Sequence, residues 1–325
     1  MKNGKLPENI LKRSVLRQFH TERDDVLIGA GADCAAVRMN GYEAAVFSTD
    51  PVIWTEDADA KRVVHAVCND LACSGAQPVG LLLTALLPSD TEEADMRRMV
   101  QLTESECEQI GIQILGGHTE ITPAVNRPVI SVSGIGKVCE DQMVFPGKVQ
   151  PGEDILVTKW IGLEGTARIA RRREQELRQR YPSYMVADTA AFDRYISVLP
   201  EAALAAEHGV TAMHDVSEGG IFGALWEMAE CSGVGLEIDL KKIPVRQETI
   251  EICNFFDINP YQLVSGGSML MAAPDGDSLA RELVAAGIPS AVIGKAMPGN
   301  DRVIINDGER RFLERPGPDE IHKMI

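Results

Sequence analysis

The sequence has little positive charge, no long apolar run and no paired cysteines, and each absence excludes a class of protein. Lysine and arginine number 32 against 48 aspartate and glutamate residues, which gives a formal net charge of -16. A surface this acidic repels a phosphate backbone and argues against a nucleic-acid partner. No run of roughly 18 apolar residues is present, and the first residues, MKNGKLPENILKR, do not resemble a signal peptide. We therefore expect a cytoplasmic protein without a membrane partner.

Other familiar patterns are also missing. The seven cysteines form no CxxC pair and no Cys/His spacing typical of a zinc site, so free thiols in a reducing compartment are expected. There is no Walker A loop, no dinucleotide fingerprint before a helix and no short-period repeat. What remains is an ordinary globular composition, 45% hydrophobic and 25% charged, over 325 residues. At roughly 150 residues per domain, this length favours two domains.

The apolar pattern predicts strands that alternate with helices. In the first half, strands are predicted at 43–50, 79–88, 112–117 and 128–138, with helices at 57–76 and 91–110. Two Pro-Gly dipeptides between residues 145 and 154 are typical of a linker, so we place a boundary near Gln150 and predict domains 1–150 and 151–325. The alternation then restarts with a strand at 153–159, which indicates a second α/β unit. The basic run between Arg168 and Arg180 alternates with glutamates and is interpreted as a solvated helix face.

Four polar clusters in the first half each follow a predicted strand or interrupt a helix near a glycine, where α/β proteins bind ligands. In the first, GAGAD, Gly29 and Gly31 would let the backbone approach a ligand and Asp33 could hold a metal, with an ordinary tight turn as the alternative. In the second, STDP, Asp50 closes a predicted strand, with a helix cap or turn as the alternative.

The third and fourth clusters carry further candidate ligands. Asn69 and Asp70 lie inside an otherwise apolar helix, where a polar pair is costly unless a ligand or a hydrogen bond satisfies it. The fourth cluster follows a predicted strand, and its backbone and polar side chains suit a phosphate and metal pocket, with a structural histidine as the alternative. Its members are Gly116, Gly117, His118, Thr119 and Glu120.

Carboxylates from several clusters would repel one another in one cleft unless cations offset their charge. Mg²⁺ prefers a few carboxylates together with substrate phosphates, so Asp33, Asp50 and Asp70 make sense as a set. An acidic enzyme that binds Mg-ATP through metal bridges needs few cationic residues. The overall charge is consistent with this hypothesis.

The same motifs, in this order, resemble those of the AIR synthase-related (PurM-like) superfamily. GAGADCAAV resembles its glycine-aspartate loop, FSTD and VCNDLACSGAQP resemble its STD and NDxxxxGAxP elements, and LGGHTEITP stands in the place of GGxT. In the second half, HDVSEGGIFGALWEMAE is similar to the D-(S/T)-x-GG segment and SGGSMLMA to a late glycine-containing strand. The superfamily includes aminoimidazole ribonucleotide synthetase, thiamine-monophosphate kinase, selenophosphate synthetase, phosphoribosylformylglycinamidine synthase and hydrogenase maturation protein HypE, and the resemblance is closest to HypE-like members.

The resemblance implies a two-domain α/β (α+β) fold. The N-terminal domain would bind ATP and Mg²⁺ and form a dimeric β-barrel with a second protomer, and the C-terminal α/β domain would lie on the substrate side. Carried over by motif, the metal ligands are Asp33, Asp50 and Asp70, with Glu120 as a substitute. The residues near the nucleotide are Gly29, Gly31, Asn69, Gly116, Gly117 and Thr119. The candidate catalytic groups are His118 and Asp215, with residues 218–220 on the acceptor side.

Three departures from the family pattern bear on the activity. One of the paired aspartates of the first loop is replaced by Ala32 or Cys34, depending on the register. His118 stands where kinase-like members carry aspartate and the synthetase carries glutamate, and histidine is a poorer Mg²⁺ ligand. The sequence ends in PDEIHKMI instead of the cysteine-bearing tail of hydrogenase maturation proteins.

The predicted function is ATP-dependent phosphoryl transfer to an amide or carbonyl oxygen of a small-molecule acceptor, with Mg²⁺ supplying charge stabilisation. Two alternatives stay open. One is a HypE-like ATP-dependent dehydratase in hydrogenase or metallocofactor maturation, which would work with a maturation partner protein. The other is a nucleotide-binding regulatory protein that has lost turnover, because fold alone does not fix function.

Overall fold

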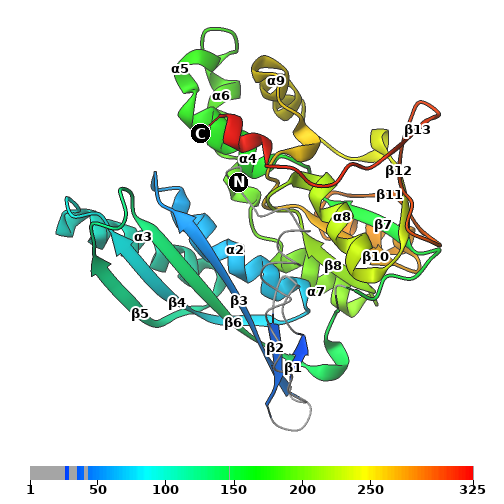
Figure 1. Ribbon diagram of the computed structural model, residues 1–325, viewed down its shortest axis with the longest axis horizontal. Helices are drawn as coiled ribbons and strands as arrows, with labels where there is room; N and C mark the ends of the chain where they lie inside the picture. The colour runs from blue at the N-terminus through cyan, green and yellow to red at the C-terminus, as the bar shows by residue number, and fades with distance from the viewer. Residues whose placement is uncertain (1–25, 29–34, 40–42, 146, 325) are drawn as a thin grey trace. The chain divides into compact units, whose positions relative to one another are not determined.

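The computed structural model describes residues 26–28, 35–39, 43–145 and 147–324 (Figure 1). They form two compact units, one within residues 22–143 and the other within residues 144–325. The N-terminal unit carries most of the predicted nucleotide and metal residues. Gly29, Gly31 and Asp33 lie outside the described residues.

The N-terminal unit is built on a six-stranded sheet. In spatial order its strands are β1 (Val26–Ile28), β2 (Ala35–Arg38), β3 (Glu43–Ile53), β6 (Val129–Cys139), β4 (Gln77–Leu87) and β5 (Gln113–Ile121). Among these described strands only β4 and β5 pair in parallel. Helices α2 (Asp59–Cys73) and α3 (Glu93–Ile110) connect β3 to β4 and β4 to β5.

Helix α2 packs on the sheet through an apolar stripe. Val63, Val67 and Leu71 recur at helical spacing and are completely buried. Burial of each such side chain stabilises the fold by about 1.5–3 kcal/mol. On β6, a Cβ atom at Gly134 would lie 2.9 Å from Cγ2 of Val67, so the glycine lets the helix approach the strand closely. This packing fixes which residues of α2 face the sheet.

The C-terminal unit is built on a seven-stranded sheet. In spatial order its strands are β13 (Glu309–Phe312), β12 (Arg302–Asn306), β9 (Gly235–Asp239), β11 (Ser290–Met297), β7 (Asp154–Thr158), β10 (Met269–Ala273) and β8 (Ala212–Asp215). Of its described strand pairs only β9 and β12 are parallel. Ile155 and Val157 of β7 share a core cluster with residues of α8 (Gly220–Ser232), whereas Leu156 between them faces the start of α10 (Gly276–Ala285). Helices therefore cover both faces of the central strands.

The remaining α-helices among the described residues of this unit are α4 (Leu163–Arg172), α5 (Glu174–Leu177), α6 (Ser183–Ala190), α7 (Leu199–Glu207) and α9 (Gln247–Phe256). The basic run lies on α4, α5 and the turn that follows. Arg173 pairs with Glu176, and Arg178 lies 2.6 Å from the carboxylate of Glu174. Arg178 is 49% exposed, as that interpretation expects, but Arg168 and Arg171 are only 17% and 20% exposed and pair with Glu164 and Asp193, so the run is a solvated face only in part. No helix within the described residues is long and apolar enough to cross a membrane.

Two strands extend further than the sequence predicted. The strand predicted to end at Asp50 continues to Ile53, and the one predicted to end at Gly117 continues to Ile121. Both are prolonged because β6 and β4, each 11 residues long, offer pairing partners beyond the apolar segments. The expectation that these two polar clusters lie in loops after strands is therefore wrong. Since most neighbouring strands are antiparallel, their carboxyl ends do not gather at one edge of the sheet.

Candidate functional site

The interface between β3 and α2 brings two predicted metal ligands to one face of the N-terminal sheet. Side chains alternate along β3, so Ser48 and Asp50 share the face of the buried residues Val46 and Val52. Oγ of Ser48 donates a hydrogen bond to Oδ2 of Asp70 on α2. Asp50 follows Ser48 by two positions, about 7 Å along the strand. The carboxylates of Asp50 and Asp70 therefore lie on the same side of the sheet, and the neighbour of Asp70, Asn69, is buried.

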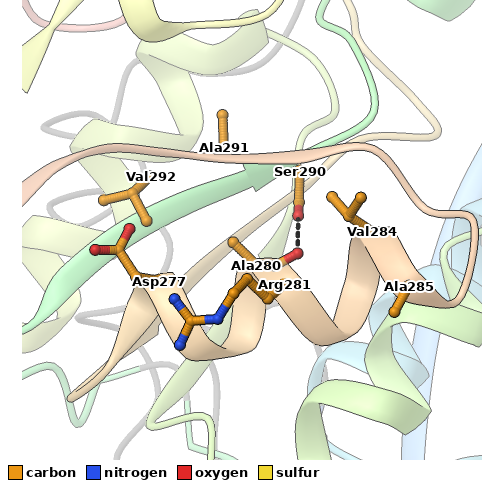
Figure 2. A pocket seen from close by; sticks show the side chains of 8 residues that line it. All are labelled: Asp277, Ala280, Arg281, Val284, Ala285, Ser290, Ala291 and Val292. Carbon is orange, nitrogen blue, oxygen red and sulfur yellow. Dashed lines mark hydrogen bonds between the residues drawn. The ribbon is translucent and has the colours of Figure 1, made fainter.

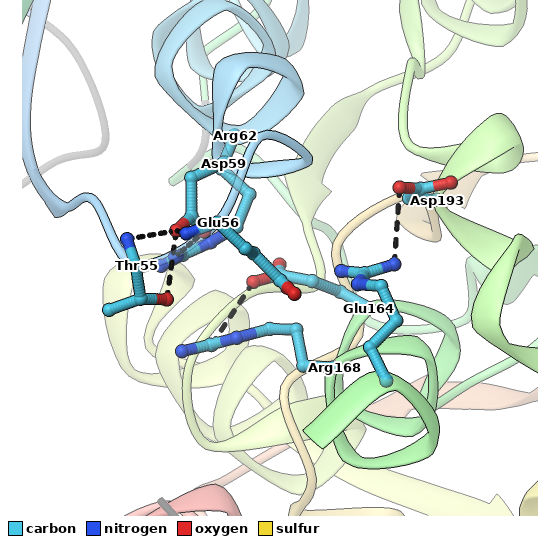
Figure 3. Close-up of polar contacts among 8 residues, drawn as sticks. Thr55, Glu56, Asp59, Arg62, Glu164, Arg168 and Asp193 are labelled. Atoms are coloured by element: carbon cyan, nitrogen blue, oxygen red, sulfur yellow. Dashed lines mark hydrogen bonds and ion pairs between the residues drawn. The ribbon is translucent and has the colours of Figure 1, made fainter. Parts of the chain in front are cut away.

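A buried carboxylate holds the first turn of α2. Asp59 accepts hydrogen bonds from the backbone N–H groups of Thr55 at 2.6 Å and Glu56 at 3.0 Å, and it lies 2.8 Å from Arg62 (Figure 3). Burial alone would raise the pKa of Asp59, but the charge of Arg62 and the hydrogen bonds from Thr55 outweigh it and hold this pKa below its usual value. The negative charge also complements the helix dipole. This network orients α2, and with it Asp70 about three turns further on.

His118 and Glu120 lie on the opposite face of the same sheet. Across β4 and β6, His118 is level with Pro51, whose side chain points away from that of its neighbour Asp50. Nε2 of His118 lies 3.5 Å from Oε2 of Glu120, and both side chains are more than half exposed. The structure therefore does not bring Glu120 together with Asp50 and Asp70 within one N-terminal unit.

The two glycines of the GGHTE segment have a structural role in the pairing of β4 with β5. Gly116 and Gly117 have φ angles of +149° and +150°, which other residues rarely adopt. A Cβ atom at Gly117 would lie only 1.8 Å from the carbonyl oxygen of Leu83. Gly117 and Thr119 share the face of Asp50, but Gly117 is three strand spacings away, about 14 Å. The close approach of β4 is therefore sufficient to explain the glycine at position 117.

The donor atoms at the β3–α2 interface fit a magnesium-bound nucleotide better than a metal cage made only of protein. Within the described ranges, no three histidine, cysteine, aspartate or glutamate side chains cluster as a metal site. Carboxylate and hydroxyl groups are hard oxygen ligands, and Mg²⁺ usually takes one or two carboxylates and completes its shell with water and phosphate. Asp50 and Asp70 supply such a pair, and Ser48 adds a hydroxyl to the same face.

In the C-terminal unit, Asp215 ends β8 and is followed by a glycine turn. The side chain of Asp215 is buried, and Nδ1 of His214 lies 2.7 Å from the carbonyl oxygen of Asp215. Nε2 of His214 lies 3.2 Å from Oε2 of Glu227 on α8. The chain enters α8 through Gly219 and Gly220, with φ angles of +93° and +62°. A Cβ atom at Gly220 would meet a carbonyl oxygen at 2.7 Å, so the turn requires glycine there.

Two contacting residues did not stand out in the sequence, whereas Ser48 belongs to the STDP cluster that was selected there without a role of its own. Asp319 accepts a hydrogen bond from the N–H of Gly219 at 2.7 Å, and Nε2 of His322 lies 2.9 Å from Oε1 of Glu218. These partners are 100 or more positions apart in the chain, so no local pattern indicates them.

A surface groove of about 480 Å³ lies between α10 and β11 (Figure 2). Asp277 and Arg281 are its charged residues, and Oγ of Ser290 is occupied by a hydrogen bond of 3.1 Å to the carbonyl oxygen of Ala280. The other lining residues are Val284, Ala285, Ala291 and Val292. None of the predicted site residues lines this groove, and one carboxylate does not make a magnesium site.

The chain forms two mixed α/β units, and the first carries a pair of carboxylates suited to a metal-bound nucleotide. Residues 31–138 match the AIR synthase related protein N-terminal domain, and residues 150–306 match the AIR synthase related protein C-terminal domain. The chain therefore belongs to the AIR synthase-related (PurM-like) superfamily of ATP-dependent enzymes.

Known relatives agree with this assignment. Carbamoyl dehydratase HypE of Rhodobacter capsulatus is 29% identical over 253 residues, which cover 76% of this chain and 72% of that protein. The structure of hydrogenase maturation protein HypE in complex with ATP superposes with a TM-score of 0.74 at 20% identity and covers 98% of this chain and 97% of that one. A ThiL structure complexed with AMPPCP and TMP gives a TM-score of 0.73 at 20% identity, with 95% and 96% covered. At this identity the structural likeness shows the fold.

Proposed function

We propose that this protein binds Mg-ATP and transfers a phosphoryl group to an amide or carbonyl oxygen of a small-molecule acceptor. The observation that carries the proposal is the position of Asp50 and Asp70 on one face of the N-terminal sheet, where Ser48 donates a hydrogen bond to Asp70. Membership of an ATP-dependent enzyme superfamily supports it. The complexes of the two structural relatives with ATP and with AMPPCP support the choice of nucleotide.

In this proposal each residue has a limited task. Asp50 and Asp70 would hold Mg²⁺, with Asp33 as a further ligand, and the bound ion would neutralise charge on the triphosphate. Ser48 orients Asp70 through its hydrogen bond, and the buried Asn69 would contact the nucleotide. Catalysis by such a site consists mainly of positioning.

Two further groups are proposed to act on protons and on the acceptor. The ring of His118, beside the carboxylate of Glu120, would transfer a proton or contact phosphate. Asp215 would face the acceptor, and the contact of His214 with its carbonyl oxygen fixes the backbone there. Because Glu120 lies on the face opposite to Asp50, we assign the metal to Asp50 and Asp70 first.

Calorimetric titration of the full chain with ATP tests the proposal. Heat of binding is expected with Mg²⁺ and is expected to disappear when a chelator removes the ion. A screen of small amides and carbonyl compounds, read out as ADP release, then identifies the acceptor class. ATP binding that does not depend on Mg²⁺, or no binding at all, would refute the role of the carboxylates.

The relationship to carbamoyl dehydratase HypE favours a second candidate. In this alternative the chain is an ATP-dependent dehydratase in hydrogenase or metallocofactor maturation and acts on a group carried by a partner protein. The same ADP assay separates the two. Stimulation by a protein that carries a carbamoyl group on a thiol, without stimulation by free metabolites, would favour the dehydratase.

We further propose that a second copy of the chain covers the open face of the N-terminal sheet, as in a dimeric β-barrel. The described helices of this unit, α2 and α3, contact its other face. On the open face Phe47, Ile53 and Leu82 are 40%, 54% and 43% exposed. Apolar side chains exposed together mark interaction sites, and a two-fold partner presents the same face in return. Among the described strands the outer edge of β5 is unpaired, and in this proposal it pairs with a strand of that copy.

Leu82→Asp is expected to convert this dimer into a monomer, because a charge at the buried centre of an interface has no partner there. Light scattering on the purified chain should show the mass fall by about half. Val100→Asp is the matched control, since Val100 is 52% exposed on α3. A monomeric parent protein, or dissociation of both variants alike, would contradict the proposed interface.

A further inference from the structure

Asp319 is a buried carboxylate that ties three segments of the C-terminal unit together. It is 2% exposed, and its Oδ2 accepts a hydrogen bond of 2.7 Å from the N–H of Gly219. Its Oδ1 accepts one of 2.8 Å from the N–H of Ile321, and the N–H of Val264 is a third donor. Gly219 belongs to the turn into α8, and Val264 stands shortly before β10. One side chain thus connects two loops that are distant in sequence.

The residues around Asp319, which we call the C-terminal strap (residues 319–323), touch the same turn a second time. Nε2 of His322 lies 2.9 Å from Oε1 of Glu218, so a protonated His322 forms an ion pair with the loop. The side chain of Ile321 is buried in a cluster with Leu263 and Val264. The strap is therefore fixed to the unit by packing and by polar contacts together.

The charged groups near Asp319 come from the turn and from the strap itself. Glu218 faces it from the turn. Within the strap, Lys323 lies 2.6 Å from the carboxylate of Glu320, and Glu320 accepts a hydrogen bond of 3.2 Å from the N–H of Asn259. Glu320 is thereby engaged with its own partners. Glu218 is the neighbour whose negative charge repels that of Asp319.

We propose that Asp319 is a positioning residue that holds the turn at Glu218–Gly220 in a proton-dependent way, firmly in weakly acidic solution and more loosely at neutral pH. The turn carries Gly219 and Gly220 and follows Asp215, the residue assigned to the acceptor. Only the assignment of this turn to the acceptor side rests on the proposed function. This contact between Asp319 and the turn, which we call the clamp, would thus set how freely the acceptor side of the site rearranges.

The sign of the pH effect follows from the environment of Asp319. Burial raises the pKa of Asp319 to about 6 and Glu218 adds to the rise, against the hydrogen bonds from Ile321, Gly219 and Val264. In a released strap the carboxyl group would return to its ordinary pKa of 3.8. Because the docked strap binds the proton more tightly, docking is firmest below the released pKa and weakens as the pH rises to about 6.

Hydrogen–deuterium exchange on the full chain tests the clamp. After correction for the intrinsic effect of pH, protection of residues 216–222 should fall about fourfold between pH 5.5 and 7.5. Asp319→Asn keeps an oxygen acceptor but cannot titrate, so most of this pH dependence should vanish. Residues 155–157 of β7, buried in the same unit, are the internal reference. Equal protection at both pH values in the parent protein, or unchanged pH dependence in Asp319→Asn, would overturn the proposal.

A second measurement covers the case in which Asp319→Asn fails to fold. The carboxyl carbon of Asp319 in the parent protein can be followed by NMR, and its titration midpoint is expected near 6. In Glu218→Gln this midpoint should move to lower pH, because a repelling charge is removed. A parent midpoint at the ordinary value would refute the clamp. Neither measurement uses ATP, so a failure of the clamp and a failure of the proposed phosphoryl transfer are distinguishable.

Discussion

Asp70→Asn is expected to lower Mg-dependent ATP turnover by about 10²–10³-fold. A bound metal contributes several kcal/mol of charge stabilisation, and each tenfold in rate corresponds to about 1.4 kcal/mol. The amide oxygen of asparagine can still accept the hydrogen bond from Ser48, so the contact between β3 and α2 should persist. The substitution thus removes a negative charge and leaves the packing of α2 unchanged.

The measurement combines calorimetry of Mg-ATP binding with ADP release, for Asp50→Asn, Asp70→Asn and the double variant. Asp90→Asn, at an exposed position between β4 and α3, is the matched control and should behave like the parent protein. The melting curves of all variants should overlap if the fold is intact. Mg-dependent ATP binding that persists in the double variant would show that neither carboxylate belongs to the nucleotide site.

Glu201→Ala is expected to lower the free energy of unfolding by about 3–5 kcal/mol, because it leaves a buried ammonium group without its counter-ion. Nζ of Lys159 lies 2.8 Å from Oε1 of Glu201, and the side chains are 9% and 1% exposed. The same Nζ donates to the carbonyl oxygens of Tyr195 at 2.9 Å and Ser197 at 2.5 Å. These contacts tie the end of β7 to the segment before α7.

Urea denaturation of this variant at two pH values checks the cause. Burial lowers the pKa of Lys159, while the charge of Glu201 acts to raise it. Without Glu201 the ammonium group of Lys159 loses its proton more readily. The difference in free energy of unfolding between the parent protein and the variant should therefore shrink as the pH rises. Glu174→Gln, which breaks the exposed pair with Arg178, is the control and should leave the unfolding curve unchanged. A deficit that does not depend on pH would point to lost packing.

Helix α2 shows what the sequence can predict. The spacing of Val63, Val67 and Leu71 predicted an amphipathic helix, and these side chains are the ones that pack on the sheet. The same pattern made Asn69 and Asp70 conspicuous, because polar residues interrupted an apolar stripe. Local periodicity is enough here, since a helix determines which of its own residues share a face.

Strand ends and strand faces depend on partners that are distant in sequence. Gly116 and Gly117 favoured an early end to β5, but pairing with β4 carries the strand through them to Ile121. Whether Glu120 shares a face with Asp50 depends on register across three neighbouring pairs of strands, which local pattern does not contain. The contact of Asp319 with Gly219 spans 100 positions and likewise cannot be predicted from the local sequence.

The alternation of β3 restricts which length changes the N-terminal unit can accept over evolutionary time. One residue gained or lost after Ser48 would turn the carboxylate of Asp50 to the side of Pro51 and expose it, because every later side chain changes face. The exposed connection around Asp90 carries no such restriction and can lengthen freely. Insertions that separate relatives of this chain should therefore accumulate between β4 and α3 and be absent between Ser48 and Asp50.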